Sequence, residues 1–275
     1  AQGEFYFTDT VELAVNAGLK LGLSVLDDPQ EMLGVNSRQD LAQCFQVLNR
    51  RTCNRLMTEG VTIMAPDSVM IAPEVSVGAD SVIYPNVTLI GEQSYGTHCT
   101  IGPSLTVHGT VTTQNHVAVF HSYLIGPISA KQGCSIGPYS HVRHGVYLEE
   151  NVSIGNFVEV KNAEVGANSN AKHLSYLGDV TVGENLNMGG GAVIANYDPL
   201  SDTKQMSRIE DDVKIGCNSV IISPVTLHEG ANIAAGSVIT KDVSAWSLGI
   251  ARSRQTEITG WVKKTLKKLK SAVLV

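Results

Sequence analysis

The chain has 275 residues, of which 43% are hydrophobic, 17% charged and 5% aromatic. This length allows one large or two ordinary domains, and the composition indicates a globular chain with a mainly aliphatic core and excludes general disorder. A formal net charge of −6 gives no electrostatic basis for nucleic-acid binding, so we expect small-molecule substrates and no nucleic-acid partner.

The N-terminal part is expected to be helical. Residues 1–37 resemble the end of another domain, with one short helix around Thr10–Gly18, and are too few to hold a core. Residues 38–60 are interpreted as a linker helix, followed by a change to strand after Gly60. The apolar residues that fall near helical spacing in this linker are Leu41, Phe45, Leu48 and Leu56.

Residues 61–252 carry an internal repeat of six residues. Period six does not keep apolar residues on one face of a helix, whereas three short strands with corners close a triangular coil of eighteen residues. We therefore predict a mainly β chain folded as a left-handed parallel β-helix of hexapeptide repeats, rather than a β-sandwich with accidental spacing. The runs are Val77, Ile83, Leu89, Tyr95, Ile101, Val107; Ile136, Val142, Leu148, Ile154, Val160; Val182, Met188, Ile194; and Ile215, Ile221, Leu227, Ile233.

The repeat is interrupted at three places. It skips one residue between Val160 and Val165, and again between Leu177 and Val182. It breaks after Ile194, where residues 197–202 are expected to form a polar loop. Loops that leave a rigid scaffold often carry function, so we expect the chemistry near these interruptions.

Residues 253–275 form a short basic tail. We expect a solvated terminal helix, with binding to a membrane surface or an anionic ligand as the alternative. The lysines of this tail are Lys263, Lys264, Lys267, Lys268 and Lys270.

Two features of the sequence indicate where a ligand binds. Arg143 and Lys161 are eighteen residues apart, so a coil of that length places them side by side, as in a phosphate site, unless both are ordinary surface charges. The run Gly189–Gly191 lets a ligand approach the backbone closely and exposes N–H donors.

Several segments resemble a known family, the bacterial bifunctional enzymes that are both glucosamine-1-phosphate N-acetyltransferases and N-acetylglucosamine-1-phosphate uridylyltransferases. The similarity is strongest over residues 136–252 and weakest over 61–130. The matching segments are Gly3–Asp9, Gly34–Arg38, Gly155–Lys161, Lys172–Asp179, Asn196–Asp198, Pro224–Thr226, Ile233–Ser237 and Thr240–Val243.

The resemblance implies acetyl transfer from acetyl-CoA to the amine of glucosamine-1-phosphate, for UDP-N-acetylglucosamine and cell-envelope synthesis. It makes His173 the general base, a role suited to a side chain whose ordinary pKa lies near neutral pH. It also implies a homotrimer with sites between subunits. The sugar-phosphate ligands would be Arg143, Lys161, Tyr176 and Asn187, and the acetyl-CoA contacts Gly190, Asn196, Tyr197, Cys217, Ala235 and Arg252.

The sequence departs from the family in two ways. Cys217 stands where the family carries serine, and the glycine-rich nucleotide loop ending in Pro-Lys is missing. Asn36 matches the family's magnesium-binding asparagine, but it is a single ligand. We therefore expect magnesium binding only with the missing half of a full-length parent. We expect no uridylyltransferase activity from this chain alone. The chain starts at Ala1, and we expect it to be a fragment or a processed product.

The sequence favours a cytoplasmic protein without stable membrane association. Its five cysteines are scattered without a Cys-x-x-Cys pair, and it has no signal peptide and no eighteen-residue apolar run.

Three other functions remain open. His116 and His121 resemble part of the zinc site of γ-type carbonic anhydrases. The acceptor of the acyl group could also be serine or a UDP-sugar, or the chain could be an inactive trimeric scaffold.

Overall fold

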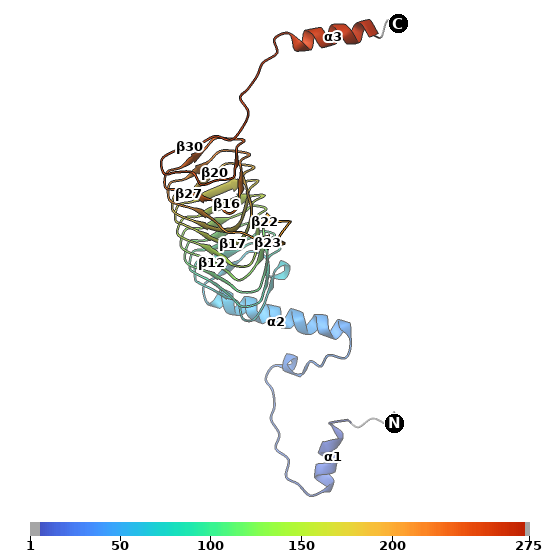
Figure 1. Ribbon diagram of the computed structural model, residues 1–275. Helices are drawn as coiled ribbons and strands as arrows, with labels where there is room; N and C mark the ends of the chain where they lie inside the picture. The colour runs from blue at the N-terminus through green and yellow to red at the C-terminus, as the bar shows by residue number, and fades with distance from the viewer. Residues whose placement is uncertain (1–5, 273–275) are drawn as a thin grey trace. The chain divides into compact units, whose positions relative to one another are not determined.

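The computed structural model describes residues 6–272 (Figure 1). Side chains are described up to Leu269. Gly3–Phe5 of the N-terminal resemblance and the side chain of Lys270 therefore lie outside the described residues. The chain divides into two units, residues 1–48 and 49–275. This division falls inside a helix that the sequence assigns to one linker, and the domain boundaries drawn from the sequence stay a prediction.

The first unit is helical where it is described. It contains α1 (Asp9–Asn16), the 3-10 helix Pro29–Met32 and the start of α2 (Arg38–Thr58). A capping box begins α2, because the Asp40 carboxylate accepts hydrogen bonds from the backbone N–H groups of Asn36 and Ser37, at 3.0 and 2.8 Å. These hydrogen bonds, the one from Asn36 first, lower the pKa of Asp40. Both predicted helices are therefore present.

The second unit is a parallel β-helix with three ladders of short strands. The first ladder consists of β1 (Thr62–Ile63), β4 (Val82–Ile83), β7 (Thr100–Ile101), β10 (Ala118–Val119), β13 (Ser135–Ile136), β16 (Ser153–Asn156), β18 (Asn170–His173), β20 (Asn187–Met188), β25 (Lys214–Ile215), β28 (Asn232–Ile233) and β30 (Leu248–Gly249).

The second ladder consists of β2 (Met70–Ile71), β5 (Thr88–Ile90), β8 (Thr106–His108), β11 (Tyr123–Ile125), β14 (His141–Val142), β17 (Glu159–Val165), β19 (Tyr176–Val182), β21 (Val193–Ala195), β26 (Val220–Ile222) and β29 (Val238–Ile239). The third consists of β3 (Ser76–Val77), β6 (Gln93–Tyr95), β9 (Val111–Thr113), β12 (Ile128–Ala130), β15 (Val146–Leu148), the later halves of β17 and β19, β24 (Ser207–Ile209) and β27 (Thr226–Leu227).

The registers of these ladders confirm the predicted parallel β-helix and exclude a β-sandwich, because strands one coil apart pair in parallel. Thr100 pairs with Val82 and with Ala118, each eighteen residues away. The two predicted skips are present as the seven-residue strands β17 and β19, which run from the second ladder into the third.

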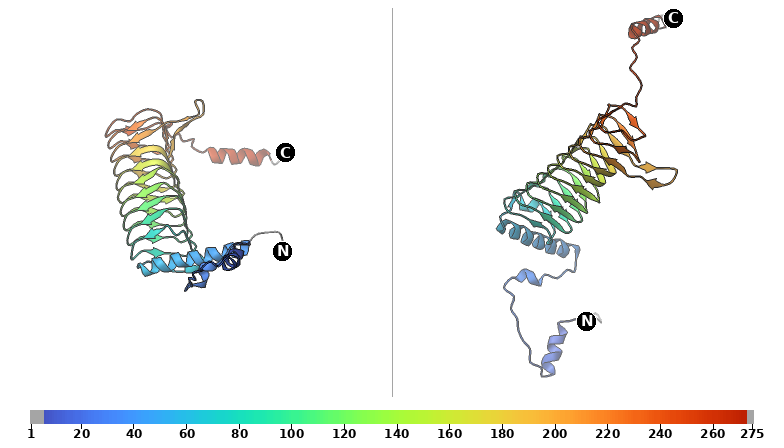
Figure 2. Two further views of the ribbon diagram at one scale, coloured as in Figure 1. Left: turned by 90° about the horizontal axis from the view of Figure 1, so that it is seen from below. Right: turned by 60° about the vertical axis from the view of Figure 1, so that its left-hand side comes forward.

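The predicted break is a hairpin that leaves the stack of coils. It pairs β22 (Tyr197–Asp198) with β23 (Thr203–Lys204) in antiparallel register, and it lengthens the coil between Asn187 and its partner Lys214. Figure 2 shows this hairpin projecting sideways from the column of coils, so it is free to contact ligands or a neighbouring molecule.

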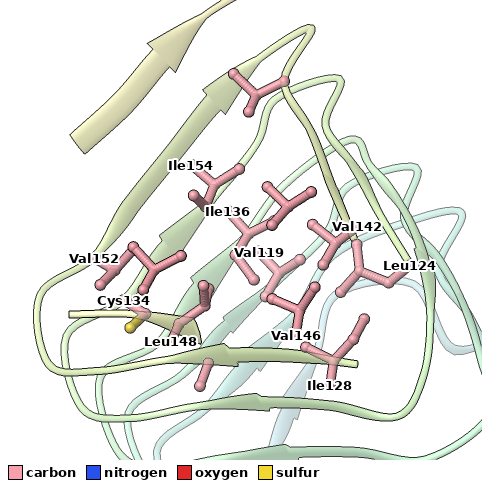
Figure 3. Close-up of a cluster of buried hydrophobic side chains, with 14 of the residues drawn as sticks. Val119, Leu124, Ile128, Cys134, Ile136, Val142, Val146, Leu148, Val152 and Ile154 are labelled. Carbon is pink, nitrogen blue, oxygen red and sulfur yellow. The ribbon is translucent and has the colours of Figure 1, made fainter. Parts of the chain in front are cut away.

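The core is a set of aliphatic columns inside the triangle. Val119, Ile136 and Ile154 are register partners on successive coils, and each is only 1% exposed. Figure 3 shows these side chains and those of the other two faces pointing into one interior. Burial of such a side chain contributes about 1.5–3 kcal/mol, so the stacked columns hold the coils in register.

The C-terminal segment ends in α3 (Trp261–Ala272), where the sequence predicts a basic helix. Its apolar residues Trp261, Val262 and Leu266 are exposed. Within residues 6–272, no helix is long and apolar enough to cross a membrane.

Candidate active site

One corner of the β-helix stacks residues that the sequence assigns to catalysis and to acetyl-CoA. Asn156 on β16 is the register partner of His173 on β18. The same register continues through Gly190, because β18 pairs with β20 and a Cβ built on Gly190 would lie 3.4 Å from the Cβ of His173. The parallel pairing of β20, β25 and β28 extends this column to Cys217 and Ala235.

His173 is exposed, and one of its two ring nitrogens is hydrogen-bonded. Its Nδ1 lies 2.8 Å from Oδ1 of Asn156. Because an amide oxygen only accepts hydrogen bonds, Nδ1 is the nitrogen that carries the proton in the neutral imidazole, and Nε2 then has the lone pair. The hydrogen bond to Asn156 therefore orients the ring and leaves Nε2 without a side-chain partner.

The glycine run beside His173 offers a backbone donor. The N–H of Gly189 donates to the carbonyl of Ile215, and the N–H of Gly191 donates to the carbonyl of Leu174. Among the described residues, the intervening N–H of Gly190 has no backbone acceptor. A donor at this position is suited to stabilising negative charge that develops on an oxygen next to His173.

Three cations gather on the second ladder, just past this corner. Arg143 directly follows β14, and Lys161 lies on β17. The register of these two strands places the two residues opposite each other, as their spacing predicts. Nη1 of Arg143 donates to Oε1 of Glu159 at 2.9 Å. Lys204, from the end of the hairpin, is the third cation and lies within hydrogen-bonding reach of Lys161.

The crowding of positive charge changes the titration of Lys161. The largest cause that lowers the pKa of Lys161 is a hydrogen bond that Lys204 donates to its neutral form, and burial and the charges of Lys204 and Arg143 lower the pKa further. Among the residues that the structure describes, only the carboxylates of Glu159 and Asp179 oppose these cations by contact. The cluster is therefore suited to an anion with several oxygens, such as a phosphate group.

Tyr176 and Asn196 join the cation cluster to the His173 corner. Tyr176 begins β19, three residues after His173, and its hydroxyl accepts a hydrogen bond from Nδ2 of Asn196 at 3.3 Å. Gly178 makes this arrangement possible, because a Cβ at that position would collide with the Tyr176 hydroxyl. Asn196 itself is only 6% exposed.

The remaining predicted site residues lie around this centre. Asn187 is exposed on β20, three residues before Gly190. Arg252 lies beside Gly236, because a Cβ built on Gly236 would be 3.8 Å from Cδ of Arg252. Tyr197 is exposed on the hairpin, where its hydroxyl donates to Asp202 at 3.0 Å. Asn36 belongs to the other unit of the chain, residues 1–48.

Four contributing residues have no role in the sequence interpretation. Asn156 and Glu159 lie inside the matched segment Gly155–Lys161, and this membership was the available signal. Lys204 and Asp179 meet at the base of the hairpin, where the two side chains lie 3.9 Å apart. Nothing periodic in the sequence relates these two positions.

The histidine pair considered for zinc lies elsewhere. The ring of His116 stacks on that of His98 at 4.9 Å, and the ring of His121 lies 5.7 Å from that of Tyr139. Among the residues that the structure describes, no group of three or more histidine, cysteine or acidic side chains is placed to hold a metal ion.

A protein-family model matches two stretches of the repeat. Residues 131–162 and 206–241 match the family model "Bacterial transferase hexapeptide (six repeats)". The chain is similar to solved UDP-N-acetylglucosamine acyltransferases, with 17% identity and a TM-score of 0.39 for that of Francisella novicida, over 76% of this chain and 73% of that one.

Curated relatives are much more similar in sequence. The chain is 39% identical to the "Bifunctional protein GlmU" of an Exiguobacterium species over 96% of this chain and 58% of the relative. It is 41% identical to that of Halalkalibacterium halodurans, over 96% and 57%. The chain thus spans little more than half of the relatives' length. The resemblance predicted from the motifs is confirmed, and the chain is homologous, over nearly its whole length, to part of the bifunctional protein GlmU.

Proposed function

We propose that this chain transfers the acetyl group of acetyl-CoA to the amine of glucosamine-1-phosphate. The observation that carries the proposal is the joint presence of an oriented free base, His173, and a three-cation cluster of Arg143, Lys161 and Lys204. The base suits an amine nucleophile, and the cations suit its phosphate. The proposal predicts that free CoA appears much faster when glucosamine-1-phosphate is added to the protein and acetyl-CoA than when it is left out.

The reaction follows from these positions. The cation cluster holds the sugar phosphate, and the amine attacks the thioester carbonyl while Nε2 of His173 accepts its proton. The N–H of Gly190 donates to the oxyanion of the tetrahedral intermediate. When that intermediate collapses, the carbon–sulfur bond breaks, the proton passes to the thiolate, and N-acetylglucosamine-1-phosphate and CoA leave.

Acetyl-CoA is proposed to run along the corner column. Gly190, Cys217 and Ala235 leave the column with small side chains, so a thioester and its pantetheine chain can approach the backbone. Cys217 is exposed, and its thiol is of similar size to the serine of the family. Asn196, Tyr197 and Arg252 would complete the acetyl-CoA contacts, and Tyr176 and Asn187 those to the sugar.

The lowered pKa of Lys161 predicts a pH dependence. Below that pKa Lys161 is charged and binds phosphate fully, and as the pH rises through it the charge is lost, so KM for glucosamine-1-phosphate increases. Lys161→Arg keeps its charge at all accessible pH values. We expect KM to rise on the alkaline side for the wild type and to stay flatter for Lys161→Arg; equal alkaline increases would contradict the assignment.

We infer a homotrimer with its sites between subunits, as the resemblance implies, and an exposed apolar strip that adjoins the site supports such an interface. Tyr139, Phe157 and Leu174 are 59%, 58% and 63% exposed, and the rings of the first two stack at 5.7 Å. Phe157 follows Asn156 in the chain, and Leu174 follows His173. Such a patch is typical of a surface that a second copy covers.

The strip predicts the effect of one charge on assembly. Phe157→Asp puts a carboxylate into the strip, so the mass in solution should fall from three chains of 29.3 kDa towards one, as measured by light scattering. His98→Asp is the matched control, because His98 is also an exposed, ring-stacked residue with positive φ. A Phe157→Asp protein that stays trimeric would contradict this interface.

The wider role is proposed for a full-length parent. The product would then serve UDP-N-acetylglucosamine and cell-envelope synthesis, with a uridylyltransferase half that binds magnesium. Asn36 alone does not fit a magnesium site, because the nearby Asp40 carboxylate is already used by two backbone N–H groups. All five cysteines lie in the described range and are free thiols. Free cysteines support the proposed cytoplasmic location.

A further inference from the structure

Asp179 has a buried carboxylate between the two parts of the proposed site. Its side chain is only 9% exposed and lies at a corner, where the backbone φ is +50°. Its Oδ1 accepts a hydrogen bond from Nδ2 of Asn162 at 2.6 Å, and its Oδ2 accepts one from Nδ2 of Asn196. A buried carboxylate is costly unless it is paired in this way.

The corner itself does not require a charge. Asn162, at the same corner one coil earlier, adopts a φ of +44° with an uncharged amide. At another corner, Asn151 and Asn168 make an amide–amide hydrogen bond of 3.2 Å, again without a charge. The negative charge of Asp179 therefore needs a reason other than the geometry of the coil.

That reason lies in the hairpin. Asn196 directly precedes β22, and Lys204 ends β23, so Asp179 contacts both ends of the segment that leaves the coil. The backbone closes the same base, because the N–H of Gln205 donates to the carbonyl of Asn196 at 2.8 Å. Asp179 is thus a fixed point on the scaffold to which the hairpin is attached.

The negative charge of Asp179 also reduces the repulsion within the cation cluster. Lys204 lies beside Lys161 and feels the charge of Arg143, and like charges at short range repel. The carboxylate of Asp179, 3.9 Å from Nζ of Lys204, offsets that repulsion when no phosphate is bound. It keeps the third cation close to the other two before the substrate arrives.

We propose that Asp179 is a positioning residue that anchors the hairpin and holds Asn196 and Lys204 ready for the substrates. It touches no reacting atom and acts through the two side chains that it binds. The proposal rests on the proposed acetyl transfer for its effect on activity, whereas the attachment of the hairpin is independent of any reaction.

Asp179→Asn tests the proposal, with Asp212→Asn as its control. Asp212 is also a corner aspartate with positive φ, +60°, whose Oδ1 accepts from an asparagine amide, that of Asn185, at 3.1 Å. Loss of one charge-assisted contact to Lys204 should raise KM for glucosamine-1-phosphate about tenfold, with kcat within about threefold of the wild type. Asp212→Asn should keep the wild-type KM.

A second measurement follows the hairpin directly. Lys204 is 44% exposed, so trypsin cleavage after Lys204, measured by mass spectrometry, reports how firmly the hairpin is held. Asp179→Asn should be cleaved there several-fold faster than Asp212→Asn. Equal cleavage rates would overturn the anchor, and faster cleavage with an unchanged KM would overturn the positioning role. Absence of acetyl transfer in the wild type would instead overturn the proposed function and leave the cleavage test valid.

Discussion

Replacing His173 by asparagine should lower kcat for acetyl transfer by about 10²–10⁴-fold, the usual contribution of a general base. Asparagine has no titratable nitrogen, so it cannot accept the proton of the attacking amine. Because His173 is exposed and donates its one observed side-chain hydrogen bond to Asn156, the fold and the KM values should change little. The measurement is the release of free CoA under saturating substrates.

His116→Asn is the control for this substitution. His116 is likewise exposed, at a corner position whose φ of +57° asparagine tolerates, and its ring stacks on that of His98. It should keep wild-type kcat. Activity of His173→Asn within tenfold of the wild type would show that another group takes the proton.

The second large effect is expected at Arg143. Arg143→Gln keeps a donor for Glu159 and removes the positive charge, so mainly the phosphate contact is lost. A hydrogen bond to a charged group contributes roughly 1.5–3 kcal/mol, which corresponds to an increase of about 10–150-fold in KM for glucosamine-1-phosphate. KM for acetyl-CoA should stay near its wild-type value.

Arg208→Gln controls for the loss of a surface ion pair. Arg208 lies 3.6 Å from Glu210 and is 70% exposed on the third ladder. Its replacement should leave both KM values unchanged. If Arg143→Gln raised KM no more than Arg208→Gln does, the cation cluster would not be the phosphate site.

The fold could be predicted because a six-residue period has one simple structural solution. Interior aliphatic residues stack on counterparts one coil away, as Val119, Ile136 and Ile154 do. The same period explains why Arg143 and Lys161 could be placed side by side from their spacing alone. Regular coils turn distance along the chain into distance in space.

The column at the active corner could not be derived in this way. Asn156 and His173 are seventeen residues apart and Gly190 and Cys217 are twenty-seven apart, because the hairpin is inserted between them. Only the resemblance to a family connected these positions. The roles that it implies for His173, Gly190 and Cys217 remain proposals, whereas their stacking is observed.

The contacts of the hairpin could not be predicted from the sequence. Lys204 and Asp179 lie twenty-five residues apart, and a loop has no period that would relate its end to a corner of the preceding coil. Their meeting depends on how the antiparallel pair β22–β23 folds back on its own base. The regular coils were thus predictable, and the contacts that assemble the site were not.

The most direct test of the proposed function is a comparison of acceptors. The protein is incubated with acetyl-CoA and, in parallel, with glucosamine-1-phosphate, glucosamine, serine or a UDP-amino sugar, and free thiol is measured over time. The account predicts rapid release of CoA with glucosamine-1-phosphate, matched by N-acetylglucosamine-1-phosphate, and much slower release with glucosamine, which lacks the phosphate. Equal rates with and without the phosphate, faster transfer to another acceptor, or no release at all would contradict it.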